Sequence, residues 1–329
     1  MQTNHVVSGL RLRPYQGESD LADLVRVENL EAEADALPER SNVEDMAAQF
    51  AHPNDSFDPA RDVTLAEMDG QVVAVAFRNV VDTTDGVREY RLNGAVDPAF
   101  RRRGIGRALL LENERRLRDV AAGEHGASRR VYGSWNGDSQ PASAALLQSA
   151  GYGRVRYFFD MVRPNLDDIE DVTLPDGLEI RSIGPELTRA VWDADIEAFR
   201  DHWGGFDHSD EQLQRWLSSP SNDLSLWLVA FDGGEVAGGV INSIDAHQNE
   251  AMGFQRGWLS SVFTRRAWRR RGLAKALIAR SLALHRDRGM TSAALGVDAE
   301  NPSGALGLYE GMGFAVNYRA TAWRKAFEA

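Results

Sequence analysis

Two arginine-rich stretches of nearly the same sequence carry the residues of this chain best suited to binding an anion. "RRRGIGRALL" begins at Arg101, and "RRRGLAKALI" begins at Arg269, 168 residues later. Each follows a strand-like segment and leads into an apolar, helix-like one. The N–H groups at a helix start lack internal partners, the helix dipole adds positive charge there, and a glycine lets a ligand approach the backbone. Each stretch is therefore predicted to seat a pyrophosphate.

Other interpretations of the arginine stretches fit less well. A dinucleotide-binding loop comes early in a strand–helix–strand unit and needs an acid at the next strand's end, whereas "GIGRALL" follows several hairpin-like strands. A Walker A loop is excluded because no Gly-Lys-Ser/Thr stands at the required spacing. A solvent-exposed basic helix start stays open for one copy alone, but two copies in matching contexts favour ligand binding.

The similarity extends well beyond the arginines. "LRLRPYQ" from Leu10 matches "LEIRSIG" from Leu178, and both read as short strands followed by helices. "VTLAEMDGQVVAVAF" from Val63 matches "LWLVAFDGGEVAGGV" from Leu226, and the central Asp-Gly in each predicts a hairpin. A repeat this long indicates a duplicated domain. We expect one domain over residues 1–168 and a second over residues 169–329, divided near the acidic, proline-containing residues 163–177.

Composition limits the class of protein. The chain has 329 residues, a net charge of −12 and no cysteine. Disulfides, thiolate nucleophiles and cysteine-rich zinc sites are therefore excluded. The acidic balance disfavours nucleic acid as a partner, and no apolar run has the length of a membrane span. No signal peptide is visible, so the expectation is a cytoplasmic globular protein without a nucleic-acid or membrane partner and without a metal.

The motifs resemble those of the GNAT superfamily of acyl-CoA-dependent N-acyltransferases. Its core signature is Arg or Gln, two residues, Gly, one residue, then Gly or Ala, and both arginine stretches match it. "LGVDAENPSGALGLYEGMGF" from Leu295 is similar to a second conserved block of the superfamily. The resemblance covers nearly the whole chain. It implies an α/β fold of the α+β kind, with a mixed sheet that splays in the middle, present as two tandem GNAT-like domains.

The resemblance also implies acetyl-CoA as the cofactor and indicates the residues that hold it. The pantetheine arm would lie along the strand before the arginine loop, and the pyrophosphate would lie on the loop amides, with Asn301 at the pantetheine or at a helix start. In the second half these residues are Val262, Phe263, Thr264, Arg269, Arg270, Arg271, Gly272, Leu273, Ala274, Lys275 and Asn301. In the first half they are Val96, Arg101, Arg102, Arg103, Gly104, Ile105, Gly106 and Arg107.

The implied chemistry is direct attack of an amine on the acyl thioester, with a small molecule as acceptor. Tyr309, in the Leu-Tyr-Glu sequence, is the implied acid that protonates the departing thiolate, and a phenol's usual pKa near 10 lies above that of a thiol. Leu147 stands at the matching place in the first half. The second half is therefore expected to be active, and the first to be catalytically silent. Glu250 and Asp245 are candidates for the base, with exposed loop charge as the alternative for both.

The sequence says less about the acceptor pocket and about the oligomeric state. Residues 193–217, which carry Trp203, Phe206 and Trp216, are expected to contribute to the acceptor pocket. A non-catalytic protein that binds or senses acyl-CoA is the alternative function. Because a duplicated domain can replace a homodimer, the expected state is a monomer whose two domains pair like subunits.

Overall fold

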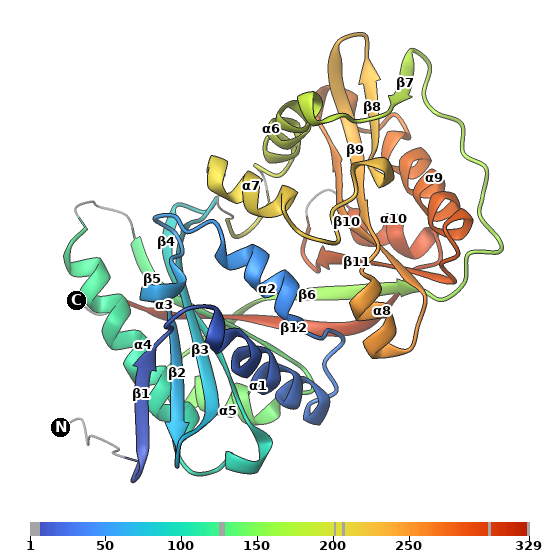
Figure 1. Ribbon diagram of the computed structural model, residues 1–329. Helices are drawn as coiled ribbons and strands as arrows, with labels where there is room; N and C mark the ends of the chain where they lie inside the picture. The colour runs from blue at the N-terminus through green and yellow to red at the C-terminus, as the bar shows by residue number, and fades with distance from the viewer. Residues whose placement is uncertain (1–6, 125–128, 201, 206–207, 302–303, 328–329) are drawn as a thin grey trace. The chain divides into compact units, whose positions relative to one another are not determined.

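The computed structural model describes residues 7–124, 129–200, 202–205, 208–301 and 304–327, which form two compact units (Figure 1). The first unit comprises residues 1–156, 204–215 and 320–329, and the second comprises residues 157–203 and 216–319. Neither unit is one continuous stretch, because each takes in segments from both halves of the sequence. In the described residues, no helix combines the length and the apolar character needed to cross a membrane.

The first unit is a mixed sheet with helices on both faces. Its strand order is β1-β2-β3-β4-β5-β12. Helices α1 and α4 both contact β3 and β4, and separate hydrophobic clusters lie beneath each helix. The strands are β1 (Leu10–Pro14), β2 (Val63–Met68), β3 (Gln71–Asp82), β4 (Val87–Val96), β5 (Arg129–Gly137) and the end of β12 (Ala315–Ala326). The helices are α1 (Leu21–Ala34), α2 (Val43–Phe50), α3 (Pro59–Asp62), α4 (Ile105–Ala122), α5 (Pro141–Ser149) and most of α7 (Asp210–Leu217).

The second unit repeats this plan, in the strand order β6-β11-β10-β9-β8-β7. Helix α6 packs on β9 and β10 over one apolar cluster, and α9 contacts the same strands over another. The strands are most of β6 (Gly153–Arg163), β7 (Leu178–Arg181), β8 (Leu228–Asp232), β9 (Glu235–Ser243), β10 (Arg256–Thr264) and β11 (Ser292–Asp298). The helices are α6 (Thr188–Ala198), α8 (Ala246–Met252), α9 (Leu273–Asp287) and α10 (Ala305–Gly311).

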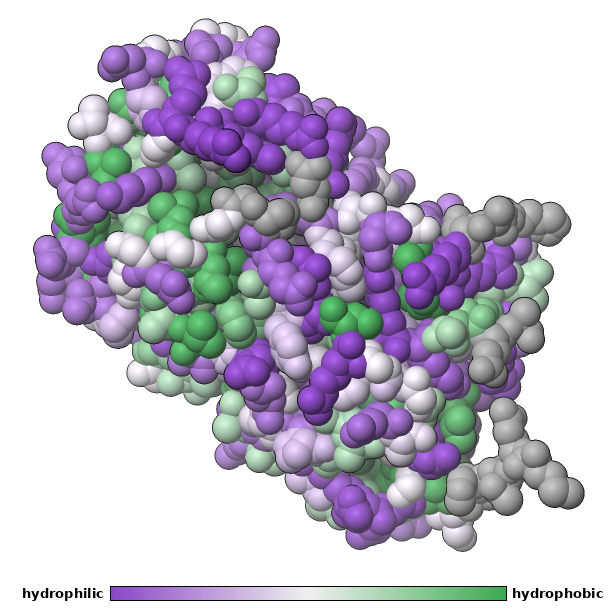
Figure 2. Space-filling model, turned by 180° about the vertical axis from the view of Figure 1, so that it is seen from behind, coloured by the Kyte–Doolittle hydropathy of each residue, from purple (hydrophilic) through white to green (hydrophobic). Residues whose placement is uncertain are grey.

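The expected hairpins and mixed sheets are confirmed. Strand β2 pairs with β3, and β8 with β9, both antiparallel. Asp69 and Gly70 both have positive φ, 52° and 80°, which suits the right-handed twist of a two-residue hairpin turn. Hydrophilic side chains cover much of the face shown in Figure 2.

Each sheet contains one short parallel pairing beside which its strands separate. In the first unit, residues 87–91 of β4 pair with residues 129–133 of β5, although both strands continue further. In the second unit, residues 256–258 of β10 pair with residues 292–294 of β11, and β10 then runs on to Thr264. The splay implied by the family resemblance is thus present in both units.

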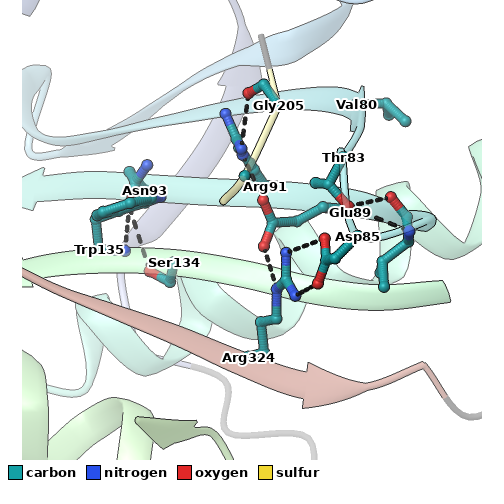
Figure 3. A network of polar contacts seen from close by, with 12 residues as sticks. Val80, Thr83, Asp85, Glu89, Arg91, Asn93, Ser134, Trp135, Gly205 and Arg324 are labelled. Atoms are coloured by element: carbon teal, nitrogen blue, oxygen red, sulfur yellow. Dashed lines mark hydrogen bonds and ion pairs between the residues drawn. The ribbon is translucent and has the colours of Figure 1, made fainter. Parts of the chain in front are cut away.

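The last strand of each half completes the sheet of the other unit. Residues 158–163 of β6 pair with β11 in the second unit, and residues 320–326 of β12 pair with β5 in the first. Polar contacts anchor β12: Arg324 bonds to Glu89 and Asp85 (Figure 3), and Lys325 bonds to the buried Glu114. The two sequence halves are therefore interlocked by exchanged strands, which the sequence repeat alone did not indicate.

Candidate active site

The two arginine loops adopt the same backbone conformation. Arg102 and Gly104 have φ of 64° and 86°, and Arg270 and Gly272 have φ of 61° and 86°. Gly104 and Gly272 are the N-cap residues of α4 and α9. Alternating left-handed residues turn successive N–H groups towards one concave side, which forms an anion-binding nest at a helix start. Both loops therefore have the backbone geometry that a pyrophosphate requires, with exposed arginines around it.

The first arginine of each loop is held within the protein. Arg269 donates from Nε to the Thr264 carbonyl at 3.0 Å and from Nη2 to the Ala198 carbonyl at 2.9 Å. Arg101 forms a bidentate pair with Asp35, at 2.7 and 2.8 Å. These guanidinium groups tie the loop to the end of the helix that follows the first strand. Their observed contacts position the nest, and direct contact of Arg101 and Arg269 with the cofactor stays a prediction.

The other basic residues predicted at the loops differ in their surroundings. Arg102, Arg107, Arg270 and Arg271 are exposed. Arg103 is exposed and lies over the Phe100 ring at 4.8 Å. Lys275 is paired with Glu170 at 2.8 Å, so its ammonium group already has a carboxylate partner. The nonpolar loop residues Ile105 and Leu273 are buried beneath the helices, so only their backbones suit the predicted role.

The end of β10 carries a buried hydroxyl that has no partner. Thr264 Oγ1 is fully buried and neither accepts nor donates a hydrogen bond among the described residues. Burial of an unpaired hydroxyl costs about 1–3 kcal/mol, which a ligand with a polar group beside it would recover. Val262 is half-buried and Phe263 is buried in the cluster below α6, so both offer the cofactor mainly their backbone groups. The unpaired hydroxyl fits a bound pantetheine arm at this strand.

A β-bulge distinguishes the second splay from the first. In β10 the pairing with β9 shifts between Leu259 and Ser261, so Ser260 is an extra residue. In β4 the register with β3 runs without a break over residues 88–96. A bulge bends the strand and redirects the side chains after it. The two units therefore share the nest and the splay, but differ in the shape of the strand that borders the splay.

In the first unit, an asparagine side chain bridges the splay. Asn93 Oδ1 accepts from the Trp135 backbone N–H at 3.1 Å and from Ser134 Oγ at 3.2 Å (Figure 3). These bonds join β4 to β5 just beyond their paired residues. Val96, which was predicted to contact the cofactor here, donates its backbone N–H to Glu31 at 3.2 Å. The Asn93 side chain and the Val96 N–H are thus already hydrogen-bonded within the protein.

Tyr309 lies within the core of the second unit with an unpaired hydroxyl. It extends from α10, is 6% exposed and packs edge-on against Phe314. Its hydroxyl makes no hydrogen bond with a described residue, and burial raises its pKa to about 12. The phenol therefore keeps its proton at neutral pH and is available to donate it. Leu147, at the matching place of the first unit, is a buried apolar residue that cannot do this.

The remaining predicted polar residues have local structural contacts. Asp245 caps α8 by accepting the Gln248 N–H at 2.8 Å, and Glu250 is exposed on the same helix. Asn301 is not the N-cap of α10, which begins after Gly304, so the helix-start interpretation of Asn301 is wrong. The backbone of Asn301 instead closes a turn with Asp298. Its contact with pantetheine stays a prediction.

The stretch expected at the acceptor pocket is divided between the two compact units. In the second unit, the ring centroids of Trp203 and Phe158 lie 6.0 Å apart. Trp216 stacks on Trp227 in that unit's core, with 4.7 Å between the ring centroids. Residues 204–215 belong to the first unit, and Phe206 lies outside the described residues. Residues 193–217 therefore do not form a single contiguous part of one unit.

One polar pair of the second unit was missed by sequence reasoning. Asp195 occupies a place in the buried stripe of α6 that also holds Val191 and Ala198, and it accepts a hydrogen bond from Ser261 Oγ at 2.5 Å. Burial raises the pKa of Asp195 to about 6. A carboxylate within an apolar stripe at helical spacing was the available signal, but the serine opposite it is set by the fold alone.

Comparisons with known proteins agree with this geometry. The sequence profile of the Acetyltransferase (GNAT) family matches residues 26–152 and again residues 188–314. A mycothiol acetyltransferase of Salinispora tropica is 32% identical over 269 residues, which cover 79% of this chain and 82% of that protein. One from Thermomonospora curvata is 34% identical over 226 residues, with 67% and 68% covered.

Solved structures of the same architecture were also found. A GCN5-related N-acetyltransferase from Sphaerobacter thermophilus superposes with a TM-score of 0.72 at 26% identity and covers 98% of this chain and 97% of its own. A tandem GNAT protein from the clavulanic acid biosynthesis pathway superposes with a TM-score of 0.73 at 17% identity, with 97% and 99% covered, and so shares the fold. The chain belongs to the GNAT family of acyl-CoA-dependent N-acetyltransferases and carries the family's domain twice.

Proposed function

We propose that this protein transfers an acetyl group from acetyl-CoA to the amine of a small molecule, in the second of two domains that span residues 1–168 and 169–329. The observation that carries the proposal is the placement of Tyr309, a largely buried tyrosine whose pKa is raised by burial to about 12, in the unit that also has the bulged splay. The first domain has the nest but has Leu147 in place of the tyrosine, so it is catalytically silent. The cytoplasm is its expected compartment, because the proposed donor is an intracellular metabolite.

The residues of the second unit divide the work of binding and proton transfer. The N–H groups around Arg270 and Gly272 bind the pyrophosphate, and the unpaired edge of β10 with Thr264 Oγ1 binds the pantetheine arm. Acetyl-CoA supplies an acyl group activated as a thioester. Tyr309 donates its proton to the departing thiolate, which a phenol protonated at neutral pH is able to do.

The acceptor is proposed to be of the mycothiol type. The support is similarity over most of the chain to proteins named mycothiol acetyltransferases. The monomer expected from the sequence agrees with a chain that exchanges strands within itself, since exchange between two chains is then not needed to complete the sheets.

The test combines binding and product detection. Calorimetric titration of the full chain with acetyl-CoA should give one site if only the second unit binds, or two if both nests are functional. The purified protein is then incubated with acetyl-CoA and a panel of amines that includes mycothiol lacking its acetyl group. The acetylated product is followed by mass spectrometry, because an acceptor with a thiol would itself react in a thiol-release assay. Binding without any product would favour the acyl-CoA-binding alternative.

A further inference from the structure

Asp195 is a buried carboxylate whose only protein partner among the described residues is a serine hydroxyl. It is 9% exposed, and Val191, Ala194 and Ala198, the buried residues beside it on α6, belong to an apolar cluster. Ser261 Oγ donates to its Oδ1 at 2.5 Å. A buried carboxylate is normally compensated by a cation, and no cationic side chain in the described part of the chain pairs with this one. The Asp195 carboxylate can therefore take up a proton, and Ser261 Oγ is the group through which that proton would arrive.

The charged side chains around α6 interact with residues other than Asp195. On α6 itself, Glu197 pairs with Arg265 at 2.8 Å, and Asp193 pairs with Arg189 at 3.0 Å. On the adjacent strands, Glu235 of β9 approaches Arg265 at 3.7 Å, Arg256 of β10 lies over the Phe254 ring, and Asp232 of β8 accepts from the Trp268 ring. Titration of Asp195 is therefore governed by its own burial and by Ser261.

The bulge in β10 turns Ser261 towards Asp195. Leu259, before the bulge, lies opposite Asn242 and packs in the cluster below α9. Ser261, after it, lies opposite Ile241, which belongs to the cluster below α6. If Ser260 were paired as a regular strand residue, the alternation of the strand would place Ser261 on the same face as Leu259. The irregularity that borders the splay is thus also what forms the Ser261–Asp195 pair.

The same strand also fixes where the acetyl group would lie. The nest follows the C-terminal end of β10. An acetyl-CoA whose phosphates occupy the nest would extend its pantetheine arm back along β10, from Thr264 towards Trp258, where β10 and β11 separate. The thioester at the far end of that arm then lies beside the bulge. Ser261 is therefore the polar side chain of β10 placed near the reacting carbonyl on the α6 face.

We propose that Ser261 and Asp195 form the proton-accepting pair for the acceptor amine, an inference that rests on the proposed function. The amine nitrogen forms a bond to the acetyl carbon as the carbon–sulfur bond breaks. The amine gives a proton to Ser261 Oγ, which passes its own proton to Asp195. The departing sulfur takes the phenolic proton of Tyr309, and solvent restores both groups. Ser261 is then a catalytic residue, and Asp195 is a positioning residue that acts through it.

The first unit lacks this pair, in agreement with the absence of the tyrosine. At the 168-residue offset that relates the arginine loops, Asp195 corresponds to Val27 and Ser261 to Asn93. Val27 is fully buried in an apolar cluster, and Asn93 bridges the splay. The proton acceptor, the bulge and the proton donor are therefore found together in one unit and are all missing from the other.

The test uses the full chain with acetyl-CoA and an acceptor that the wild-type protein acetylates. Asp195→Asn keeps an oxygen that can accept from Ser261 but holds no negative charge. We expect kcat to fall at least tenfold, with the Kd for acetyl-CoA unchanged. In the wild type, kcat/KM should rise with pH through an acid limb with a midpoint near 6, since Asp195 must be ionised, and this limb should be missing from the variant.

Matched variants separate a catalytic from a structural role. Asp193→Asn, on the exposed side of the same helix, should keep the wild-type rate and profile. Ser261→Ala should lower kcat similarly, and the double variant should be no slower than the single ones, because both belong to one pathway. If Asp195→Asn does not fold, the pH dependence of kcat/KM in Ser261→Ala is measured in its place.

Wild-type kcat and an unchanged acid limb in Asp195→Asn or Ser261→Ala would overturn the pair while leaving the proposed function intact. Absence of turnover in the wild type with every acceptor would overturn both.

Discussion

Arg324 in β12 forms an ion pair with Glu89 in β4, with 2.7 Å between Nε and Oε1, although 235 residues separate them in the sequence. Glu89 is 2% exposed and also accepts from Arg91 at 2.7 Å (Figure 3). A carboxylate buried to this degree depends on its cationic partners. The C-terminal strand therefore supplies a charge that the first unit needs, in addition to pairing with β5.

Arg324→Met should destabilise the first unit by about 1.5–3 kcal/mol, because it removes one charged partner of the buried Glu89 and leaves Arg91 as the other. Urea unfolding followed by circular dichroism measures the effect. Arg280→Met, at an exposed place on α9, serves as the control and should change the free energy of unfolding by less than about 0.5 kcal/mol. Equal stability of the two variants would show that the ion pair contributes nothing.

A fragment of residues 1–168 should not fold on its own. It lacks β12, which leaves the β5 edge unpaired and the buried Glu89 and Glu114 without Arg324 and Lys325. We expect no cooperative thermal transition for the fragment, whereas the full chain should show one. A fragment with native-like helix content and a sharp transition would contradict the stabilising role of the exchanged strand.

Tyr309→Phe should lower kcat at least tenfold and leave the affinity for acetyl-CoA unchanged. The substitution removes the hydroxyl but keeps the ring that packs against Phe314. Turnover and calorimetric binding are measured on the same preparation. Tyr15→Phe, in the first unit, controls for loss of a tyrosine hydroxyl elsewhere. Unchanged turnover in Tyr309→Phe would remove this residue from the mechanism.

Gly272→Ala should weaken binding of acetyl-CoA by about tenfold. At φ 86° an alanine costs about 1–2 kcal/mol, and relief of that strain distorts the nest. Gly233→Ala, in a hairpin turn at φ 56°, introduces a similar strain away from the site and should bind normally. Gly104→Ala makes the same change in the first unit. It should leave turnover unaffected and abolish a second calorimetric site if the wild type has one.

Glu31 should make stability depend on pH. Burial raises its pKa from 4.5 to about 7, although Val96 N–H and Arg101 act in the opposite direction. The folded chain then holds a proton that the unfolded chain has already lost, so the stability falls as pH rises from about 4.5 to 7, by up to about 3 kcal/mol. Glu31→Gln cannot ionise and should lose this decline, whereas the exposed Glu33→Gln should keep it. Melting temperatures over this pH range measure the effect; parallel curves for wild type and Glu31→Gln would exclude the contribution.

Local sequence determined most of the elements and much of the cofactor site. The Asp-Gly turns between alternating segments fixed both hairpins, and the placement of Gly104 and Gly272 between a strand and an apolar helix fixed both nests. These features depend on residues near one another in the chain, so local pattern and backbone preference are sufficient to predict them. The family motif around Tyr309 identified the candidate acid in the same way.

The tertiary structure alone decided what distant segments do together. Which sheet β6 and β12 join, and thus which residues each compact unit contains, depends on edge pairing between strands with the same local pattern, so periodicity within a strand cannot specify it. The pairing of Asp195 with Ser261 likewise requires a one-residue bulge that reverses the direction of a side chain. A repeat in the sequence predicted two similar domains, but only packing across long separations determined that their strands are exchanged and that one of them holds the polar pair.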